Sequence, residues 1–191
     1  MRAQGLGPSK GFRAEVDSVE KLKTERLVLR PFSAGDAQAV VRLAGVREIA
    51  DTTENVPHPY DLQAAQEWIG GHAAGWEERR LACWAITAKD SQALMGAFSV
   101  RLARYQIGDI GYWLGKDYWG RGYVTEAGLA VVAYAREQLG LHRLQARHLV
   151  RNPASGRVLQ KLGFSVEGRH PGAVVKWGKR EDMVSLGLIL S

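Results

Sequence analysis

The chain has 191 residues, of which 46% are hydrophobic and 24% charged, and this length and composition are typical of one globular domain with a sizeable core. Its apolar runs fall short of the roughly 18 residues of a membrane-spanning helix, residues 1–23 lack the apolar block of a secretory signal, and a single cysteine excludes an internal disulfide. We therefore expect a cytoplasmic protein with no membrane partner. The formal net charge of +6 favours an anionic partner, a class that includes nucleic acids, membrane surfaces and small anions.

The N-terminal third is predicted to contain one strand and two helices. Residues 1–23 are rich in Gly, Ser and charge and are predicted to be a flexible extension, so the domain is expected to span residues 24–191. Hydrophobic periodicity predicts, in chain order, a strand at 26–30, a helix that begins at Ser33 or Asp36, and a helix at 61–80. Two prolines make residues 51–60 a predicted loop. Gly70 and Gly71 weaken the second helix, and a break there is left open.

From residue 81 onward the periodicity is mainly that of strands. Apolar segments at 81–87 and 93–102 flank a short polar turn and predict a hairpin. The later elements are expected to be, in order, a strand at 107–114, a buried helix at 125–139, a strand at 144–150, a helix at 153–162 and final strands at 164–167 and 182–190. Glycines inside 107–114 indicate a bulge or a close backbone approach. Helices interleaved with a strand meander predict an α/β fold with a mixed sheet.

The most informative segment is a glycine-rich loop, Trp119-Gly120-Arg121-Gly122-Tyr123, between a predicted strand and a predicted helix. Glycines let the backbone turn its amides toward an anion, and a helix N-terminus adds partial positive charge, so a diphosphate is the expected ligand. An ordinary loop with two glycines is the alternative. The P-loop is excluded because tyrosine follows the second glycine. The dinucleotide fingerprint is excluded because it requires a third glycine where Thr125 stands, and a strand that opens a parallel βαβ unit.

Positive charge is concentrated downstream of this loop. Residues 138–166 contain no Asp or Glu, yet they include Arg143, Arg147, Arg151, Arg157 and Lys161. A local positive field of this kind suits a polyanion, and a solvated basic face is the alternative.

Three segments together resemble one protein family. Residues 111–114 and 118–127 resemble the coenzyme A motif of GNAT acetyltransferases, and they are most similar to the RimJ/RimL-like branch. Residues 24–31 and 152–164 resemble two further signatures of that branch, in the same order, so the resemblance extends over residues 24–190. It implies a GNAT fold: a central mixed, mostly antiparallel sheet of about seven strands, splayed between the fourth and fifth, flanked by about four helices.

The same resemblance implies an acetyl-CoA-dependent N-acetyltransferase that needs no metal. Pantetheine is expected in the gap between the splayed strands, bonded to Tyr112, Trp113 and Leu114. The diphosphate is expected on the backbone of Trp119, Gly120, Arg121, Gly122, Tyr123, Val124 and Thr125. The residues expected to complete the cofactor site are Asn152, Ser155, Arg157 and Lys161. Trp119 and Val124 depart from the superfamily's usual residues, but a contact made through the backbone is expected to survive the change.

The reaction needs an unprotonated amine and stabilisation of the departing sulfur. An α-amine, with a pKa near 8, is an easier nucleophile than a lysine near 10.4. Many GNAT enzymes have a tyrosine acid where Leu159 stands, and the resemblance offers Ser155 as its substitute. Asp109, beside the expected gap, is the first candidate base and Glu167 the second. An ordinary carboxylate is the alternative for these two, and a helix-capping or first-turn role is the alternative for Asn152 and Ser155.

The acceptor amine is expected, from the resemblance, to lie against the region 51–76, where Asp51, Glu54 and Tyr60 are candidate contacts. A protein N-terminal α-amine is the expected acceptor. The alternatives are a small-molecule N-acetyltransferase for an aminoglycoside, polyamine or amino acid, and a non-catalytic basic ribosome- or RNA-binding module. Nucleic acid is disfavoured because the aromatic residues fall in the expected cofactor motif or core. The histidines lack metal-ligand spacing, Cys83 is expected in the core, and a homodimer is left open.

Overall fold

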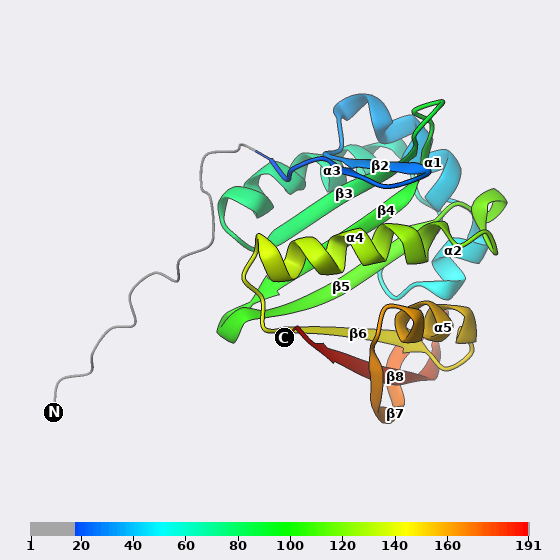
Figure 1. Cartoon of the computed structure of the whole chain (residues 1–191). Coiled ribbons are helices and arrows are strands. Elements are labelled where there is room, and N and C mark those ends of the chain that lie inside the picture. Colours follow the sequence, from blue (N-terminus) through cyan, green and yellow to red (C-terminus); the bar gives the residue numbers. More distant parts are fainter. Residues whose placement is uncertain (1–17, 191) are drawn as a thin grey trace, which may run out of the picture.

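One mixed sheet organises the chain (Figure 1). The computed structural model describes residues 18–190. The strands are β1 (Leu22–Lys23), β2 (Leu27–Arg30), β3 (Leu81–Ala88), β4 (Leu94–Ala103), β5 (Ile107–Leu114), β6 (Arg143–Leu149), β7 (Ser165–Lys176) and β8 (Lys179–Ile189). The α-helices are α1 (Ala37–Ala44), α2 (Arg47–Thr52), α3 (Leu62–Glu77), α4 (Tyr123–Glu137) and α5 (Pro153–Lys161). The strand order is β1-β2-β3-β4-β5-β6-β8-β7, with β5 and β6 parallel and the other described neighbours antiparallel.

The predicted fold is confirmed, with eight strands and five α-helices among the described residues. The additional strand, β1, comes from the predicted extension and pairs with β2. Val19 is buried, and the indole of Trp84 donates to the carbonyl of Glu20 at 2.8 Å, so the packed domain includes residues before Thr24. The prediction for residues 1–17 lies outside the described part of the chain. None of the helices within residues 18–190 has the length and apolar character needed to cross a membrane.

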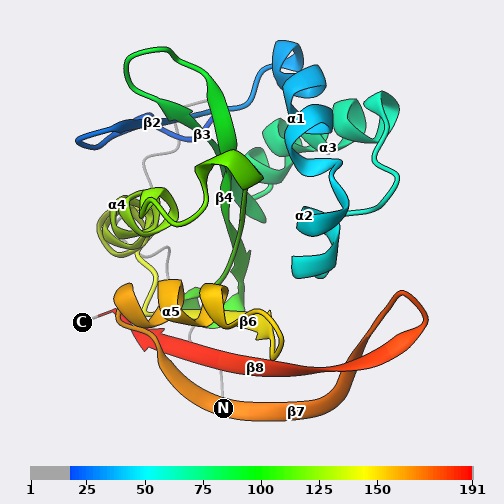
Figure 2. The ribbon, with the colours of Figure 1, turned by 90° about the vertical axis from the view of Figure 1, so that its right-hand side faces the viewer.

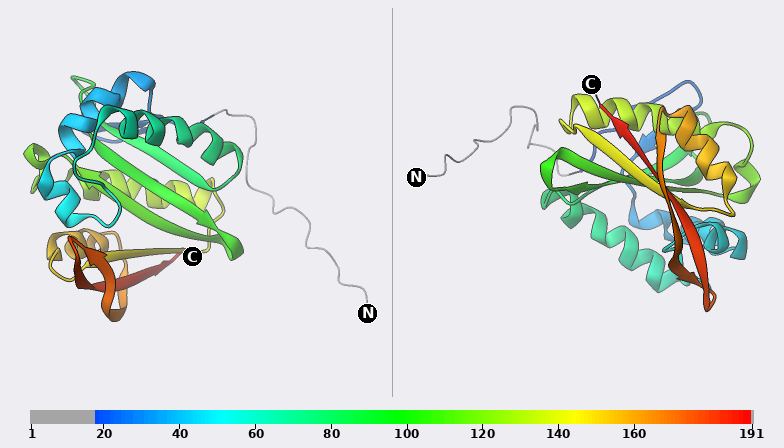
Figure 3. Two further views of the ribbon diagram at one scale, coloured as in Figure 1. Left: turned by 180° about the vertical axis from the view of Figure 1, so that it is seen from behind. Right: turned by 90° about the horizontal axis from the view of Figure 1, so that it is seen from below.

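Helices cover both faces of the sheet, and each interface is a hydrophobic core. Figure 2 shows α4 on one side of the sheet and α1 and α3 on the other, and the left panel of Figure 3 shows that second side. Trp84 and Phe98 belong to the core under α4, whereas Ala85, Ala97 and Trp113 belong to the core under α1 and α3. Because alternate residues of a strand point to opposite faces, β3 and β4 supply both cores and are apolar nearly throughout.

The elements differ from their predicted bounds mainly where tertiary contacts determine where a helix or strand ends. The last two strands form a hairpin much longer than the predicted strands at 164–167 and 182–190, and bulges near Val166 and His170 obscure its alternation. Helix α2 overlaps the start of the predicted loop. Helix α3 continues through Gly70 and Gly71, where an added Cβ would meet no atom within 4 Å.

Strands β5 and β6 pair over three positions and then separate. The pairing runs from Ile107 opposite Arg143 to Asp109 opposite Gln145, whereas β4 pairs with β5 along its whole length. Within the paired part, a Cβ on Gly108 would lie 2.7–2.8 Å from side chains of β4, β6 and the loop before β6, so glycine permits the close approach there. Beyond Asp109 a gap opens between the two strands, as the resemblance implied.

Candidate active site

A cavity of about 640 Å³ lies at this gap. Its walls are β5, the glycine loop with the start of α4, the end of β6 with α5, and the segment after α2. The expected cofactor residues that line it are Tyr112, Trp113, Leu114, Trp119, Gly120, Gly122, Tyr123, Val124, Thr125, Asn152, Ser155, Arg157 and Lys161. Arg121 is exposed and does not line it; its carbonyl accepts a hydrogen bond from Arg26 Nη1 at 3.1 Å.

The free edge of β5 presents backbone groups to the cavity. The amide of Gly115 donates to Met95 on the β4 side at 2.8 Å. Since backbone groups alternate between the two edges of an antiparallel strand, those of Leu114 and Tyr112 point toward the gap. The Trp119 indole occupies the carbonyl of Leu114 at 2.6 Å. The edge around Tyr112 is therefore available to an extended ligand that pairs as a strand does.

The glycine loop turns into α4 two residues earlier than predicted. Gly120 and Gly122 have φ of +74° and +79°, a left-handed backbone conformation that strains residues other than glycine. Helix α4 begins at Tyr123, and its N-cap Gly122 provides no side-chain cap, so the first-turn amides can bind an anion. The β5–α4–β6 unit is parallel, so one condition of the dinucleotide fingerprint is met, contrary to the expectation from the sequence. Thr125 in place of the third glycine still excludes that fingerprint.

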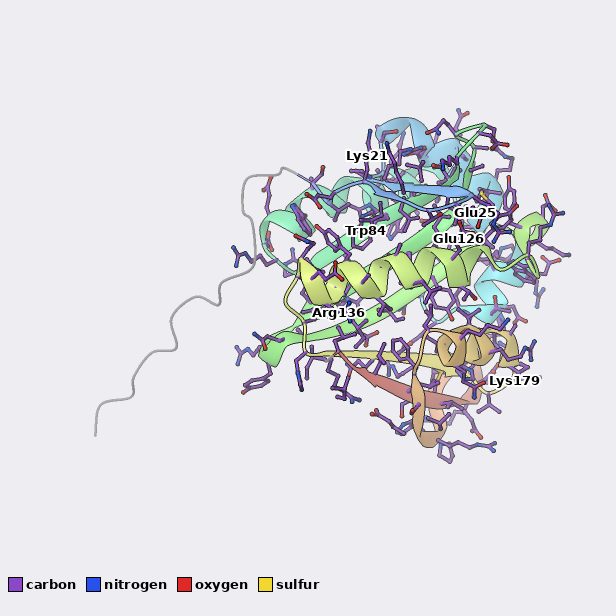
Figure 4. The ribbon with its side chains drawn as sticks, viewed as in Figure 1. Lys21, Glu25, Trp84, Glu126, Arg136 and Lys179 are labelled. Atoms are coloured by element: carbon purple, nitrogen blue, oxygen red, sulfur yellow. The ribbon has the colours of Figure 1, made fainter. Side chains whose placement is uncertain are left out.

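The glycine loop is held from outside by residues near β2. The carboxylate of Glu126 accepts from Thr24 Oγ1 at 2.5 Å, from the Arg26 amide at 2.8 Å and from Arg26 Nε at 2.7 Å. The guanidinium of Arg26 also lies 4.5 Å from the centre of the Tyr123 ring. Figure 4 shows Glu126 next to Glu25, which precedes Arg26. These contacts join the segment 24–31 to the glycine loop and the start of α4, and hydrophobic periodicity gave no signal for them.

Ser155 is paired with a tyrosine hydroxyl from β5. Its Oγ lies 2.8 Å from Tyr112 Oη, which also lies 3.2 Å from the Ser155 carbonyl oxygen. Burial raises the pKa of Tyr112 to about 12, so this hydroxyl keeps its proton at neutral pH. Asn152 caps α5 by accepting from the Ser155 amide at 3.2 Å, and its Nδ2 donates to the Thr52 carbonyl at 3.1 Å. Leu159 is buried in the core.

Asp109 lines the cavity from the opposite face of the sheet. It alternates with Tyr112 along β5 and shares the face of Trp113, which packs under α1 and α3. Burial raises its pKa, although Arg147 and Arg101 oppose the shift, and Gln145 Nε2 lies 3.5 Å from its Oδ2. A cavity carboxylate with a raised pKa is a stronger base than an ordinary aspartate, which suits it to accept a proton.

Of the other predicted catalytic and acceptor residues, one lines the cavity and three do not. Glu54 lines the cavity, with Arg147 Nη2 3.5 Å from its carboxylate. Asp51 does not line it; its carboxylate accepts from Arg151 Nη1 at 2.9 Å and from the Trp177 indole at 2.8 Å. Tyr60 is half-buried against the core under α1 and α3, and burial raises its pKa. Glu167 is exposed outside the cavity lining, where it accepts from Arg143 Nη2 at 2.5 Å.

Several cavity residues were not predicted. They are Trp68, Ser99, Arg101, Arg147 and His148. Ser99 and Arg101 alternate on β4, Arg147 and His148 are consecutive on β6, and Trp68 lies on α3, so only the tertiary fold brings them to one cavity. Cys83 is buried, as expected, and burial raises the pKa of its thiol. Within residues 18–190 no three His, Cys, Asp or Glu side chains are grouped to hold a metal ion.

Comparisons with known proteins agree with this geometry. A family model described as an acetyltransferase (GNAT) domain matches residues 26–165. The chain belongs to this family. It is 36% identical over 192 residues to the [ribosomal protein uS5]-alanine N-acetyltransferase of Escherichia coli (strain K12), a match that covers 93% of this chain and 94% of that protein. It is also 31% identical over 149 residues to the uncharacterized N-acetyltransferase YoaA of Bacillus subtilis (strain 168), covering 77% and 84%.

A solved structure of RimL, a ribosomal-protein α-N-acetyltransferase in complex with coenzyme A, has the same fold. Its TM-score is 0.83 at 18% identity, over 90% of this chain and 98% of that one. Together these matches confirm the predicted class, an acyl-CoA-dependent N-acetyltransferase, and the RimJ/RimL-like branch of the GNAT family.

Proposed function

We propose that this GNAT enzyme transfers acetyl from acetyl-CoA to the α-amine of a protein N-terminus, by direct attack in a ternary complex. The observation that carries the proposal is the two-sided cavity. The Ser155–Tyr112 hydroxyl pair lies on the α4 and α5 side, and Asp109 lies on the α1 and α3 side. The alanine N-acetyltransferase to which the chain is 36% identical supports an α-amine acceptor.

The cofactor side fits acetyl-CoA in both shape and charge. The free edge of β5 around Tyr112 suits the pantetheine amides, and the uncapped amides at the start of α4 suit the diphosphate. Arg157 and Lys161 supply positive charge from α5. Asn152 already caps α5, but its amide retains one hydrogen that can be donated to pantetheine.

The acceptor side provides for the proton that the amine must lose. Asp109 takes this proton, directly or through a water molecule, because its raised pKa brings it closer to that of an α-amine. Glu54 attracts the incoming ammonium group from the segment after α2. Glu167 remains the second candidate base, and Asp51 and Tyr60 act on the acceptor wall from outside the cavity lining.

The departing sulfur is stabilised from the other face. When Tyr112 Oη donates to Ser155 Oγ, the serine hydroxyl is free to donate to the sulfur as the thioester breaks, and each hydrogen bond polarises the next. A thiol has a pKa near 8.5, so the thiolate leaves with a hydrogen bond and does not require full protonation. The proton from the amine stays on Asp109 and the electron pair leaves with sulfur, so the step balances.

Mass spectrometry of an acceptor panel tests the proposal. The protein is incubated with acetyl-CoA and with peptides that begin with alanine, polyamines, aminoglycosides or free amino acids, and the same peptides with a blocked α-amine serve as matched controls. We expect one acetyl group on each unblocked peptide and none on its blocked partner. Acetylation confined to a small amine would favour the small-molecule alternative. Salt-dependent RNA binding without acetyl transfer would favour the non-catalytic alternative.

A further inference from the structure

Residues 52–56, which we call the acceptor strap, form the cavity wall that follows α2. The strap belongs to the N-terminal half of the chain, but its long-range hydrogen bonds within residues 18–190 lead to the C-terminal half. Asn152 Nδ2 donates to the Thr52 carbonyl at 3.1 Å, and Lys176 Nζ lies 3.3 Å from the Glu54 carbonyl and 3.5 Å from that of Val56. The wall that faces the acceptor is therefore fixed by residues 100 or more positions away in the sequence.

The tip of the β7–β8 hairpin supplies most of this attachment. Figure 2 shows the hairpin extending below α5 and curving toward α2 at its far end. Trp177, at the tip, adopts φ of +52°, which is unusual for a bulky residue. Its indole donates to Asp51 Oδ1 at 2.8 Å, and its ring lies 5.4 Å from the Arg47 guanidinium and 6.2 Å from the His58 ring.

Lys176 is buried, with 8% of its surface exposed, although it is charged. Burying an ammonium group is costly unless it is bonded, and here its bonds are to the strap carbonyls. Burial lowers its pKa, while Asp51, Glu181 and Glu54 oppose and Arg151 adds to that shift. A hairpin that served only to extend the sheet would have no need for a buried lysine at its tip.

Arg151 makes a third set of contacts beside the strap. Arg151 donates through Nη1 to the Asp51 carboxylate at 2.9 Å and through Nη2 to the Asp51 carbonyl at 2.7 Å, and its Nε bonds Glu181 on β8 at 2.5 Å. Arg151 and Asn152 follow the end of β6. Because β5 and β6 are parallel and paired only at their beginnings, these residues lie at the open end of the gap. The strap thus bridges the end where no strand pairing closes the sheet.

We propose that Lys176 and Trp177 are positioning residues of the acceptor site, which hold the strap against the C-terminal half and so fix Glu54 where it meets the incoming amine. The substrate in this inference rests on the proposed function, whereas the attachment of the strap does not. The proposed acetyl-CoA site lies on a different wall of the cavity, formed by β5, the glycine loop and α5, so coenzyme A binding should not depend on the hairpin tip.

Hydrogen–deuterium exchange of the free enzyme tests the attachment itself. Lys176→Met removes the bonds to the strap carbonyls, and Trp177→Ala removes the contacts with Asp51, Arg47 and His58 on either side of the strap. Trp177→Phe removes only the indole donor, and Val175→Thr changes an exposed neighbour on the same hairpin as the matched control. We expect faster exchange in residues 52–58 for the first two variants, an intermediate rate for Trp177→Phe, and no change in α4 for any variant. Unchanged exchange of the strap in Trp177→Ala and Lys176→Met would overturn the proposal.

Steady-state kinetics with an alanine-initiated peptide tests the role in acceptor binding. For Trp177→Ala and Lys176→Met we expect the KM for the peptide to rise about tenfold, and the calorimetric Kd for coenzyme A to stay within about twofold of the parent. An unchanged peptide KM, or an equal rise in Val175→Thr, would contradict the positioning role. If the parent enzyme acetylates no peptide, the proposed function fails, and the exchange result still decides whether the hairpin tip fixes the strap.

Discussion

The two sides of the cavity are built in different ways. On the cofactor side, the glycine loop is shaped by its own backbone: two glycines with positive φ, an uncapped helix start, and an indole that bonds a carbonyl five residues earlier. On the acceptor side, the strap is shaped by side chains from distant segments, with Arg151, Asn152 and Lys176 bonded to residues 51–56. The conformation of the glycine loop is thus set mainly by its own residues, although Thr24 and Arg26 hold it from outside, whereas the strap depends on tertiary contacts throughout.

This difference predicts how each side responds to change. A ligand held by backbone amides is insensitive to most side-chain substitutions but sensitive to any that alters the loop's conformation or sign of charge. A wall held by several side-chain hydrogen bonds is expected to lose its ordered conformation gradually, as each substitution removes one of these bonds. The cofactor site should therefore fail abruptly at a few positions, and the acceptor site should weaken gradually at many.

The largest effect is expected for Gly122→Asp. This change places a carboxylate among the amides that bind the diphosphate and puts a side chain at φ of +79°. We expect coenzyme A affinity to fall by at least about 100-fold, to the point where calorimetry detects no binding. Gly140→Asp is the matched control, because Gly140 also has positive φ and follows the other end of α4. Equal affinity in Gly122→Asp and the parent would mean that the loop does not hold the diphosphate.

A smaller effect is expected from the hydroxyl pair. If Ser155 donates to the departing sulfur, Ser155→Ala should lower kcat about 10- to 100-fold and leave acetyl-CoA affinity unchanged. Tyr112→Phe should lower kcat less, because it removes only the polarising partner. The double variant should be no slower than Ser155→Ala, since both act on one hydrogen-bond chain. A raised KM for acetyl-CoA at unchanged kcat would assign Ser155 to binding or helix capping.

The sequence was informative where structure is local. Periodicity placed most strands and helices, and glycine spacing located the anion loop, because both depend on neighbouring residues. The predicted start of α4 was two residues late. The predicted strands of the β7–β8 hairpin were too short, because bulges and the length of pairing depend on the partner strand. The pairing of β1 with β2 likewise places residues before Thr24 in the domain, where they make contacts far along the chain, such as the bond from Trp84 to Glu20.

For the site, too, the sequence predicted what depends on residue type and motif, and it missed what depends on contacts between distant segments. Residue type and family pattern made Ser155 and Asp109 the candidate catalytic residues, and both line the cavity. The partner of Ser155, Tyr112, was predicted only as a backbone contact, since no sequence pattern shows that two residues 43 positions apart share a hydrogen bond. For the acceptor wall the type of residue was insufficient. Glu54 lines the cavity while Asp51 bonds the hairpin tip, and only the fold of the segment after α2 separates these two nearby carboxylates.

A moderate effect with a distinctive pH dependence is expected for Asp109→Asn. Burial raises the pKa of Asp109, so activity of the parent enzyme should fall as pH decreases through that raised value, above the range of an ordinary aspartate near 3.9. The variant should lose about tenfold in kcat and also lose this acidic limb. A kcat equal to that of the parent at every pH would exclude Asp109 as the base.

The same residue gives a stability prediction of opposite sign. A raised pKa in the folded state means that Asp109 contributes stability below its unfolded pKa, and that this contribution is lost as pH rises through the folded value. At neutral pH we therefore expect Asp109→Asn to unfold at a higher temperature than the parent. Asp182→Asn is the control, because a bond from the Gly172 amide lowers the pKa of Asp182, so its ionised form is stabilising at neutral pH. Its unfolding temperature should fall.

The smallest effect is expected for Glu167→Gln, which tests the second candidate base. Glu167 lies outside the cavity lining, and its side chain, 41% exposed, is bonded to Arg143. Exposed ion pairs contribute only about 0–1 kcal/mol, so the variant should keep nearly the parent's stability and lose less than about twofold in kcat. Measured beside Asp109→Asn, it ranks the two carboxylates directly. If Glu167→Gln is the slower variant and loses the acidic limb, then Glu167 is the base, and the acceptor amine must approach across β6 and not along β5.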